Sequence, residues 1–341
     1  MSIAGLVRSL AAAMALVVVV AVVPCADAAS CDRACLEGIA DKYLAAMLAH
    51  DPSQAPLAKG ARYTENNVAL PLPDGLWRTI SAIGAYRLNV ADPAGGGIGF
   101  FARVQENGAP VLLSTYLKVV GGRITEMESQ VARLSDTTGS GTPANLREDQ
   151  LGLAPRSQFL TALPPGARRS RAELAAIANS YYTGLENNRG DKPPPFADDC
   201  LRLENGTQTS GRPVPPGGQP SGMTYSCKDA FALGYYHDDT RLRNRRILAI
   251  DEERGLVYAT VFFDHDATVR SYPLKDGRPV MVRNTAPWTW STQELFQVNA
   301  EGRISQVEAV LLAVPYGQRP VFSGGQHFPS PQAIKDGFRE Y

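Results

Sequence analysis

A net charge is the first thing that this sequence lacks. Its 341 residues include 34 lysines and arginines and 34 aspartates and glutamates, so the formal net charge is zero. Proteins that bind nucleic acid usually carry a basic face or stripe, and the sequence has no acidic tail either. We therefore expect no nucleic-acid partner. The length suits two domains of moderate size.

Signatures of cofactors are missing as well. The sequence contains no glycine-rich phosphate loop, no haem or flavin signature, and no Ser-His-Asp arrangement with a recognisable nucleophile elbow. No two cysteines are spaced Cys-x-x-Cys. The stretch "DHD" at residues 264–266 offers two carboxylates and a histidine to a divalent ion, but no second histidine stands at ligand spacing. We therefore expect neither a metal nor another cofactor.

Long apolar runs are limited to one, at residues 10–23. Arg8 precedes this run and the small residues "ADAAS" follow it, which is the order of a secretory signal peptide with cleavage after Ala28. A membrane anchor is the alternative, but the run is shorter than the roughly 20 residues of a spanning helix. Lipidation of Cys25 is disfavoured by Pro24. We predict a secreted or periplasmic protein with no stable membrane insertion after cleavage.

Cleavage of the signal would leave four of the five cysteines: Cys31, Cys35, Cys200 and Cys227. In an exported chain these favour disulfides over a metal site. Four cysteines allow three pairings. We prefer Cys31 with Cys35 and Cys200 with Cys227, because each pair then lies within one predicted domain.

Two stretches far apart in the chain are nearly the same: "GRITEMES" at residues 122–129 and "GRISQVEA" at residues 302–309. Each closes a similar order of elements. An amphipathic helix, at residues 39–51 or 172–188, is followed by a loop, a Glu-Asn pair, alternating strands and a turn. Repetition of this order predicts two copies of one fold.

The repeat defines the predicted domains. The first copy occupies residues 29–134 and the second residues 171–325, with a C-terminal tail at 326–341. Residues 135–170 are rich in Ser, Thr, Gly and Pro and are typical of a linker draped over the surface. At its end, Ser170 and Glu173 have the spacing of a helix capping box.

Four stretches carry a resemblance to a known superfamily: "CDRACLEGIADKYLAAMLAHDP", "ARYTENNVALPLPDGLW", "GRITEMESQVA" and "QELFQVNAEGRISQVEAVLLAVPYG". The chain resembles the nuclear-transport-factor-2-like superfamily, which includes SnoaL-like polyketide cyclases, ketosteroid isomerases and limonene-epoxide hydrolases. More narrowly, it resembles secreted fungal and bacterial proteins of unknown function. The resemblance implies an α+β fold with two tandem cone-like domains, each an N-terminal helix packed in a strongly curved antiparallel sheet around an apolar pocket. It implies no mechanism.

Strand alternation places three titratable residues on faces that otherwise look buried. Glu294 shares a face with Phe296, Glu308 with Val310, and His265 with Phe263. A carboxylate in an apolar cavity has a raised pKa, which makes it a usable base. Asp264 lies on the opposite face from His265 and remains a further catalytic candidate.

The two glutamates differ in their counterparts in the first copy. Glu308 matches Glu128, so both are expected as structural partners of arginines at the start of their strands, Arg123 and Arg303. Glu294 has a threonine as its counterpart, which makes it the better catalytic candidate. A rim or structural carboxylate is the alternative reading, just as His265 can simply be exposed at a strand end.

Aromatic residues complete the candidate site. In ketosteroid isomerases a helix tyrosine supplies part of an oxyanion hole, so the resemblance makes Tyr182 a candidate hydrogen-bond donor. Trp288 and Trp290, with Phe263 and Phe296, are the candidates for the wall of a ligand site. The alternative is that the tryptophans fill the wide end of the cone.

A short basic run, "RLRNRR" at residues 241–246, is typical of a solvated helix face or loop, with recognition of an anionic ligand as the alternative. Together these features predict a pocket protein that carries out cofactor-free acid–base chemistry (isomerase, lyase or cyclase type) on a small, largely apolar organic molecule. A non-catalytic module that binds a hydrophobic ligand or a protein is the competing hypothesis. The sequence does not indicate an oligomeric state.

Overall fold

The computed structural model describes residues 31–133, 136, 152 and 154–340. The predicted signal peptide and most of the first part of the predicted linker lie outside these residues. Within the described part of the chain, no helix combines the length and apolar character needed to span a membrane. The two predicted disulfides, Cys31–Cys35 and Cys200–Cys227, are both present.

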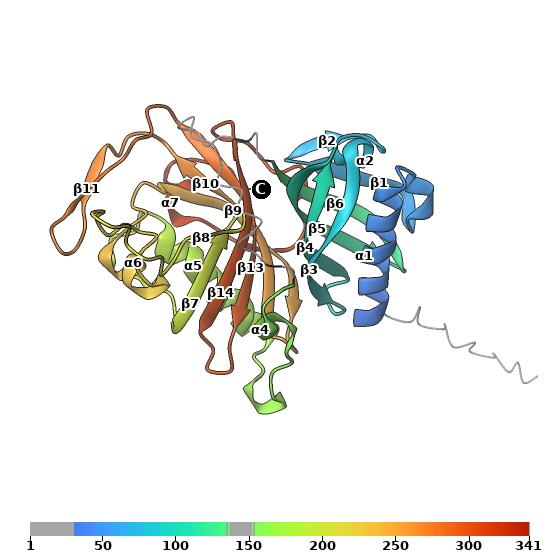
Figure 1. The fold of residues 1–341 in the computed structure, drawn as a ribbon, viewed down its shortest axis with the longest axis horizontal. Helices are drawn as coiled ribbons and strands as arrows, with labels where there is room; N and C mark the ends of the chain where they lie inside the picture. The colour runs from blue at the N-terminus through green and yellow to red at the C-terminus, as the bar shows by residue number, and fades with distance from the viewer. Residues whose placement is uncertain (1–30, 134–135, 137–151, 153, 341) are drawn as a thin grey trace, which may run out of the picture. The chain divides into compact units, whose positions relative to one another are not determined.

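The first half consists of a helix and a six-stranded sheet (Figure 1). Helix α1 (Arg33–Leu48) begins at Asp32, whose carboxylate accepts a hydrogen bond from the Cys35 amide at 2.9 Å. The remaining elements are η1 (Pro52–Gln54), β1 (Leu57–Glu65), β2 (Val68–Leu70), α2 (Leu76–Thr79), β3 (Ile80–Asp92), β4 (Gly97–Glu106), β5 (Ala109–Val120) and β6 (Arg123–Arg133).

The second half repeats this plan with additions. Helix α5 (Arg171–Leu185) begins with the predicted capping box of Ser170 and Glu173. It is followed by β7 (Phe196–Glu204), β8 (Thr207–Gln208), α6 (Cys227–Leu233), β9 (Arg241–Asp251), β10 (Leu256–His265), β11 (Ser271–Pro273), β12 (Pro279–Met281), β13 (Trp288–Val298), β14 (Ile304–Val314), β15 (Gln326–Phe328) and α7 (Pro331–Lys335).

The two large sheets have the same strand order, which establishes two tandem α+β domains. The first runs β2-β1-β6-β5-β4-β3, and the second, read in the same direction, runs β8-β7-β14-β13-β10-β9 with β15 added at its edge. Neighbouring strands are antiparallel except for one parallel pair in each sheet, β1 with β6 and β7 with β14. Register shifts between β3 and β4 and between β9 and β10 bend the strands where the sheets curve.

Both faces of each sheet are buried. Helix α1 covers one face of the first sheet and α5 one face of the second, each over its own apolar core. The opposite faces share a third core, in which Tyr86 and Phe101 of the first half join Tyr258 and Leu295 of the second. A Cβ added to Gly99 would lie 2.4 Å from the ring of Tyr258, so glycine is needed for this close approach.

The segments outside the repeated plan also pack into the fold. Phe159, in α4 (Ser157–Leu160), is fully buried in the core shared by the two halves, so this part of the predicted linker is not draped over the surface. Residues expected as a tail form β15, which pairs with β9, and α7. Glu340 then accepts hydrogen bonds from the amides of Asn244 and Ser330.

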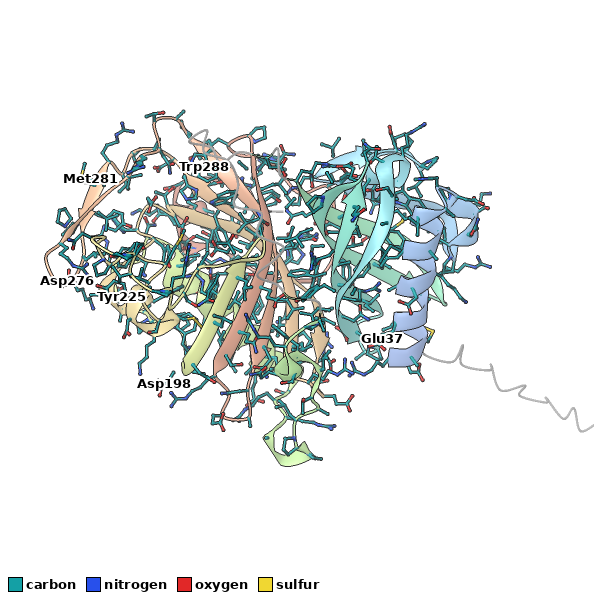
Figure 2. All side chains as sticks on the ribbon, in the orientation of Figure 1. Glu37, Asp198, Tyr225, Asp276, Met281 and Trp288 are labelled. Atoms are coloured by element: carbon teal, nitrogen blue, oxygen red, sulfur yellow. A yellow bond between two sulfur atoms is a disulfide. The ribbon has the colours of Figure 1, made fainter. Side chains whose placement is uncertain are left out.

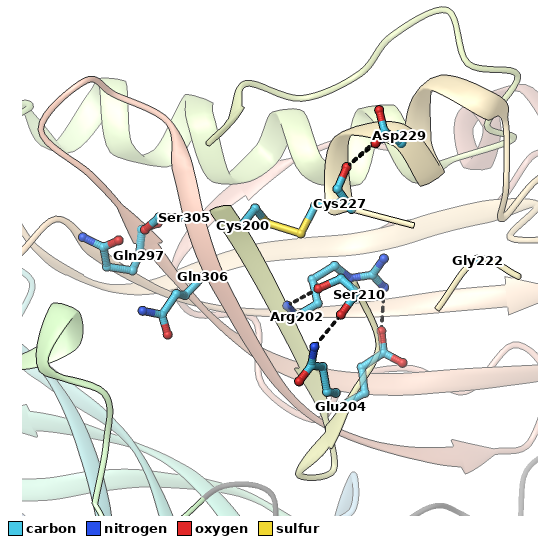
Figure 3. Close-up of a disulfide and its surroundings, with 12 residues drawn as sticks. Cys200, Arg202, Glu204, Ser210, Gly222, Cys227, Asp229, Gln297, Ser305 and Gln306 are labelled. Atoms are coloured by element: carbon cyan, nitrogen blue, oxygen red, sulfur yellow. Dashed lines mark hydrogen bonds and ion pairs between the residues drawn. A yellow bond between two sulfur atoms is a disulfide. The ribbon is translucent and has the colours of Figure 1, made fainter. Parts of the chain in front are cut away.

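An insertion between β8 and β9 is specific to the second half. The Cys200–Cys227 disulfide ties α6, within this insertion, to β7 (Figure 3). Tyr235 and Tyr272 form a small apolar cluster between the insertion and the β11–β12 hairpin. The chain then reaches β9 through residues 234–240, which positions this loop beside the second sheet.

Candidate functional site

A cavity of about 140 Å³ lies in the second half. Strands β7, β10, β13 and β14, helix α5 and the loop before β9 all contribute to its wall. The lining residues are Leu185, Arg202, Glu204, Tyr236, Asp238, Asp239, Phe263, His265, Trp290, Glu294 and Leu311. Four of the sequence-predicted candidates, which lie on one sheet face, therefore meet at one cavity: Phe263, His265, Trp290 and Glu294.

Room for the Glu294 carboxyl comes from its neighbours across the sheet. Its partners in the flanking strands are Ala259 and Ala309, the smallest side chains that a strand usually holds. Glu294 is only 2% exposed, and its Oε2 atom has no hydrogen-bond partner among the described residues. Burial raises the pKa of Glu294 to about 8, and the negative charges of Glu204 and Asp239 act in the same direction.

Tyr182 stands next to Glu294 beneath the cavity. Its hydroxyl is buried and has no partner of hydrogen-bonding geometry among the described residues, while its ring packs edge-on against Phe263 and Phe296. The hydroxyl opposes part of the rise in the pKa of Glu294. Phe296 itself belongs to the core under the cavity rather than to its wall.

His265 forms an ion pair at the edge of the cavity. Its Nε2 atom lies 2.8 Å from Oδ1 of Asp239, and both side chains are buried. Burial opposes protonation, but Asp239 more than compensates and raises the pKa of His265. The imidazole stacks on Trp288, with ring centroids 4.3 Å apart, and Trp288 meets Trp290 edge-on (Trp288 is labelled in Figure 2).

Arg202 forms a second ion pair. Its guanidinium donates a hydrogen bond to Glu204 at 2.5 Å (Figure 3). It donates another to the Tyr236 hydroxyl at 2.9 Å. The guanidinium is buried against the rings of Tyr181, Phe231 and Tyr236. The charge of Arg202 is therefore paired within the protein by Glu204, and the two side chains together form a fixed part of the wall.

Two of the predicted catalytic residues, Asp264 and Glu308, lie elsewhere in the fold. Asp264 is on the other face of β10, where Arg241, Arg243 and Thr289 bond its carboxylate. Alternation along the strand separates it from His265, so Asp264 does not line the cavity.

Glu308 lies on the face of β14 that meets the first half. It accepts a hydrogen bond from Tyr86 at 2.5 Å, and burial raises its pKa to about 7. The expected pairing with Arg303 is wrong, as is that of Glu128 with Arg123, because Glu128 instead bonds Arg246. These glutamates point into the contact between the two sheets, which the sequence did not reveal.

The basic run at residues 241–246 is buried strand and not a solvated helix or loop. Arg241 and Arg243 bond Asp264, and Arg245 bonds Glu186. Arg246 bonds Glu128 of the first half. The arginines therefore join elements of the fold, and these contacts leave no reason to expect an anionic ligand there.

The equivalent position in the first half is filled. Thr115 stands where the second half has Glu294, and it hydrogen bonds Ser129 at 2.9 Å. Its other strand neighbour is Phe100, in the place of Ala259. The Phe100 ring packs edge-on against Tyr43 of α1, so a large aromatic side chain occupies the space that the alanine leaves open.

Five lining residues with polar side chains were missed by the sequence analysis: Arg202, Glu204, Tyr236, Asp238 and Asp239. The Glu-Asn pair of the second copy includes Glu204, but the pair served only to define the repeat. The consecutive acids "DD" after "YYH" in a disulfide-bounded insertion were the available signal for the others. Their approach to the cavity depends on the path of the insertion, which alternation within strands does not encode.

A larger cavity, of about 220 Å³, lies between the two halves around Lys118 and Arg171, and no carboxyl group is among its lining residues. Within the described part of the chain, no three His, Cys, Asp or Glu side chains are arranged so that they could hold a metal ion.

Comparisons with known proteins give a family but no activity. No curated protein matches the chain. Among solved structures, a crystal structure described as a ketosteroid isomerase candidate from Kribbella flavida DSM 17836 matches with 12% identity and a TM-score of 0.24, covering 30% of this chain and 82% of that one. The family described as "Domain of unknown function (DUF8021)" matches residues 29–131 and 167–311. The two matched segments coincide with the two copies of the fold, and the chain belongs to this family.

Proposed function

We propose that the second half is a cofactor-independent acid–base catalyst, of isomerase, lyase or cyclase type, that acts on a small organic molecule in the 140 Å³ cavity. One observation carries the proposal: the buried Oε2 atom of Glu294, which has no partner in the described protein, belongs to a carboxyl that lines the cavity. A carboxyl with a pKa of about 8 exchanges a proton near neutral pH, which is what a general acid or base requires.

The remaining groups have separate roles in this proposal. Glu294 moves the proton, and the neighbouring Tyr182 hydroxyl is available to donate a hydrogen bond to Glu294 or to a developing negative charge. The His265–Asp239 pair supplies a fixed dipole at the edge of the cavity. Phe263 and Trp290 form the apolar part of the wall.

The wall is more polar than the sequence analysis predicted. Four carboxyl groups, a guanidinium and an imidazole share it with four apolar or aromatic side chains and a tyrosine, so a purely hydrocarbon ligand would leave polar groups desolvated. The substrate is therefore expected to carry polar groups. The two disulfides are typical of an oxidising compartment, which supports the proposal of a secreted or periplasmic protein.

The test begins with a screen of metabolite extracts against the purified mature protein by native mass spectrometry. Bound compounds are then incubated with wild type, Glu294→Gln and Glu308→Gln. Glu308 is the matched control, since it is equally buried and also has a raised pKa, but lies outside the cavity. We expect Glu294→Gln to reduce turnover by a factor on the order of a hundred and Glu308→Gln to leave it nearly unchanged. Recovery of every bound compound unaltered would favour a binding module instead.

A further inference from the structure

Two carboxyl groups that line the cavity have no cationic partner among the residues that the structure describes. Asp239 is paired with His265 and Glu204 with Arg202. Within the described part of the chain, Asp238 takes part in no ion pair and its carboxylate accepts a long hydrogen bond from the Tyr272 hydroxyl, at 3.4 Å. Glu294 has no ion pair among the described residues, and its Oε2 atom has no hydrogen-bond donor.

The cavity therefore has an excess of negative charge. Its wall holds four carboxyl groups, those of Glu204, Asp238, Asp239 and Glu294, against two basic side chains, Arg202 and His265, so the acids outnumber the bases by two. Like charges that share a low-dielectric site repel one another, and a bound cation relieves that repulsion.

From these observations we infer that the cavity binds a small organic cation, a protonated amine about the size of a single ring, as the ligand of the proposed catalyst. This inference rests on the proposed function, because the amine is the ligand of the proposed catalyst. Binding of the amine can nevertheless be measured whether or not the protein is a catalyst. An engineered cavity of about 150 Å³ holds a benzene molecule, and the 140 Å³ found here sets the same scale.

The wall favours an amine over a metal ion. Calcium and magnesium take about six or more oxygen ligands, waters included, and the described part of the chain holds no group of three His, Cys, Asp or Glu side chains placed to hold a metal ion. Phe263 and Trp290 instead contribute aromatic rings to the wall, and the face of such a ring attracts an alkylammonium group. The two carboxyls without a cationic partner would then face the ammonium group, Asp238 from the half-exposed loop and Glu294 from inside the protein.

Binding of a cation would also lower the pKa of Glu294. Arg202 and Glu204 act on it from β7, Asp239 from the loop before β9, and Tyr182 from α5. A bound ammonium adds a positive charge to this set and stabilises the ionised carboxylate. The ligand would thus release the proton and convert Glu294 into a base.

The experiment measures binding of three probes of nearly the same shape, benzylamine, benzyl alcohol and benzoate, by isothermal titration calorimetry at pH 7. Primary alkylamines are protonated at this pH. We expect benzylamine to bind at least about tenfold more tightly than benzyl alcohol, from the combined cation–π and charge terms. Benzoate should bind most weakly. Equal binding of amine and alcohol, or tighter binding of benzoate, would overturn the inference.

Two variants locate the site. Asp238→Asn should weaken benzylamine binding about tenfold while leaving benzyl alcohol unaffected. Asp198→Asn removes the same charge from an exposed position in β7 and is the matched control, for which no change is expected (Figure 2). Loss of binding in both variants alike would show a general surface effect and contradict the assignment. Competition by magnesium or calcium chloride beyond an equal ionic strength of sodium chloride would identify a metal site and overturn it as well.

A proton measurement separates this inference from the proposed function. Titrations in buffers of different ionisation enthalpy should show proton release on amine binding to the wild type and none to Glu294→Gln. Selective amine binding without any turnover of amines would uphold the inference and count against catalysis. Turnover of a neutral compound without amine binding would support the proposed catalysis and overturn the inference.

Discussion

Glu294→Gln should make the protein more stable at alkaline pH, although it removes the proposed catalytic group. Burial raises the pKa of Glu294 from 4.5 to about 8. The folded state therefore holds a proton that the unfolded state has lost between these two pH values. Stability falls as pH rises through that window, because the unfolded chain gains the favourable ionised form first.

The size of the effect follows from the pKa change. Each pH unit between the two values costs about 1.4 kcal/mol, so full ionisation costs on the order of 4 to 5 kcal/mol. Glutamine keeps the shape of the side chain and cannot ionise. For a domain of about 150 to 250 residues, 1 kcal/mol corresponds to roughly 2 to 4 °C in melting temperature. The variant should thus gain on the order of 10 °C over the wild type at pH 9.

The assay is thermal unfolding followed by circular dichroism at pH 5, 7 and 9. At pH 5 the two proteins should melt within a few degrees of each other, and the difference should widen steadily to pH 9. Glu301→Gln, at an exposed turn in the same half, is the matched control and should follow the wild type throughout. Parallel melting curves for wild type and Glu294→Gln across this range would show that the buried carboxyl has no raised pKa, and the acid–base argument would lose its basis.

Three further predictions concern the framework of the site. Glu308→Gln should stabilise the protein by about 3 kcal/mol at pH 8 and by far less at pH 5, because burial raises the pKa of this carboxyl from 4.5 to about 7; thermal unfolding at the two pH values measures this. Gly99→Ala should destabilise by about 1 to 3 kcal/mol in urea denaturation, since its Cβ would lie 2.4 Å from a ring of the facing sheet, whereas Gly166→Ala, with open space around it, should not. Replacing Cys200 and Cys227 with serine should weaken amine binding in calorimetry, because their disulfide ties the insertion to β7, while loss of the N-terminal disulfide should leave binding intact.

Much of the fold could be predicted because the sequence contains two copies of the same order of elements. The order of helix, strands and turns repeats, and the match between "GRITEMES" and "GRISQVEA" falls on the equivalent strands β6 and β14. Capping at Ser170 and the two disulfides depend on local spacing, which a sequence shows directly. The parallel pairing of β1 with β6 was not predicted, since it joins strands that are far apart in the chain.

The packing of the two halves against each other could not be predicted from the sequence. An alternating strand shows that two faces differ but not what covers each of them. Glu308 looked like a candidate for a pocket because its face is apolar, yet that face meets Tyr86 of the other half. The arginines of β9 look solvated by composition, and they are buried because acids from distant elements reach them.

The candidate site was predicted only in part, because alternation is visible for residues in strands but not for residues in loops. Alternation correctly put Glu294, His265 and Phe263 on one face, and comparison with Thr115 singled out Glu294. Asp238 and Asp239 enter from an irregular loop, whose course depends on the insertion and its disulfide. No periodicity marks a loop residue as part of a cavity.

The difference between the two copies is the strongest argument that the second one holds a function. Both copies have the same strand order, so the fold does not require an ionisable group at this position, and the first copy manages with Thr115 and a filling Phe100. The second copy has Ala259 and Glu294 instead, which leaves a cavity and a buried carboxyl with a raised pKa. Each change lowers stability, the first by loss of packing and the second by desolvation. Carboxyl groups with a perturbed pKa gather at functional sites, and here Glu294 lines a cavity that residues of the second copy's insertion complete.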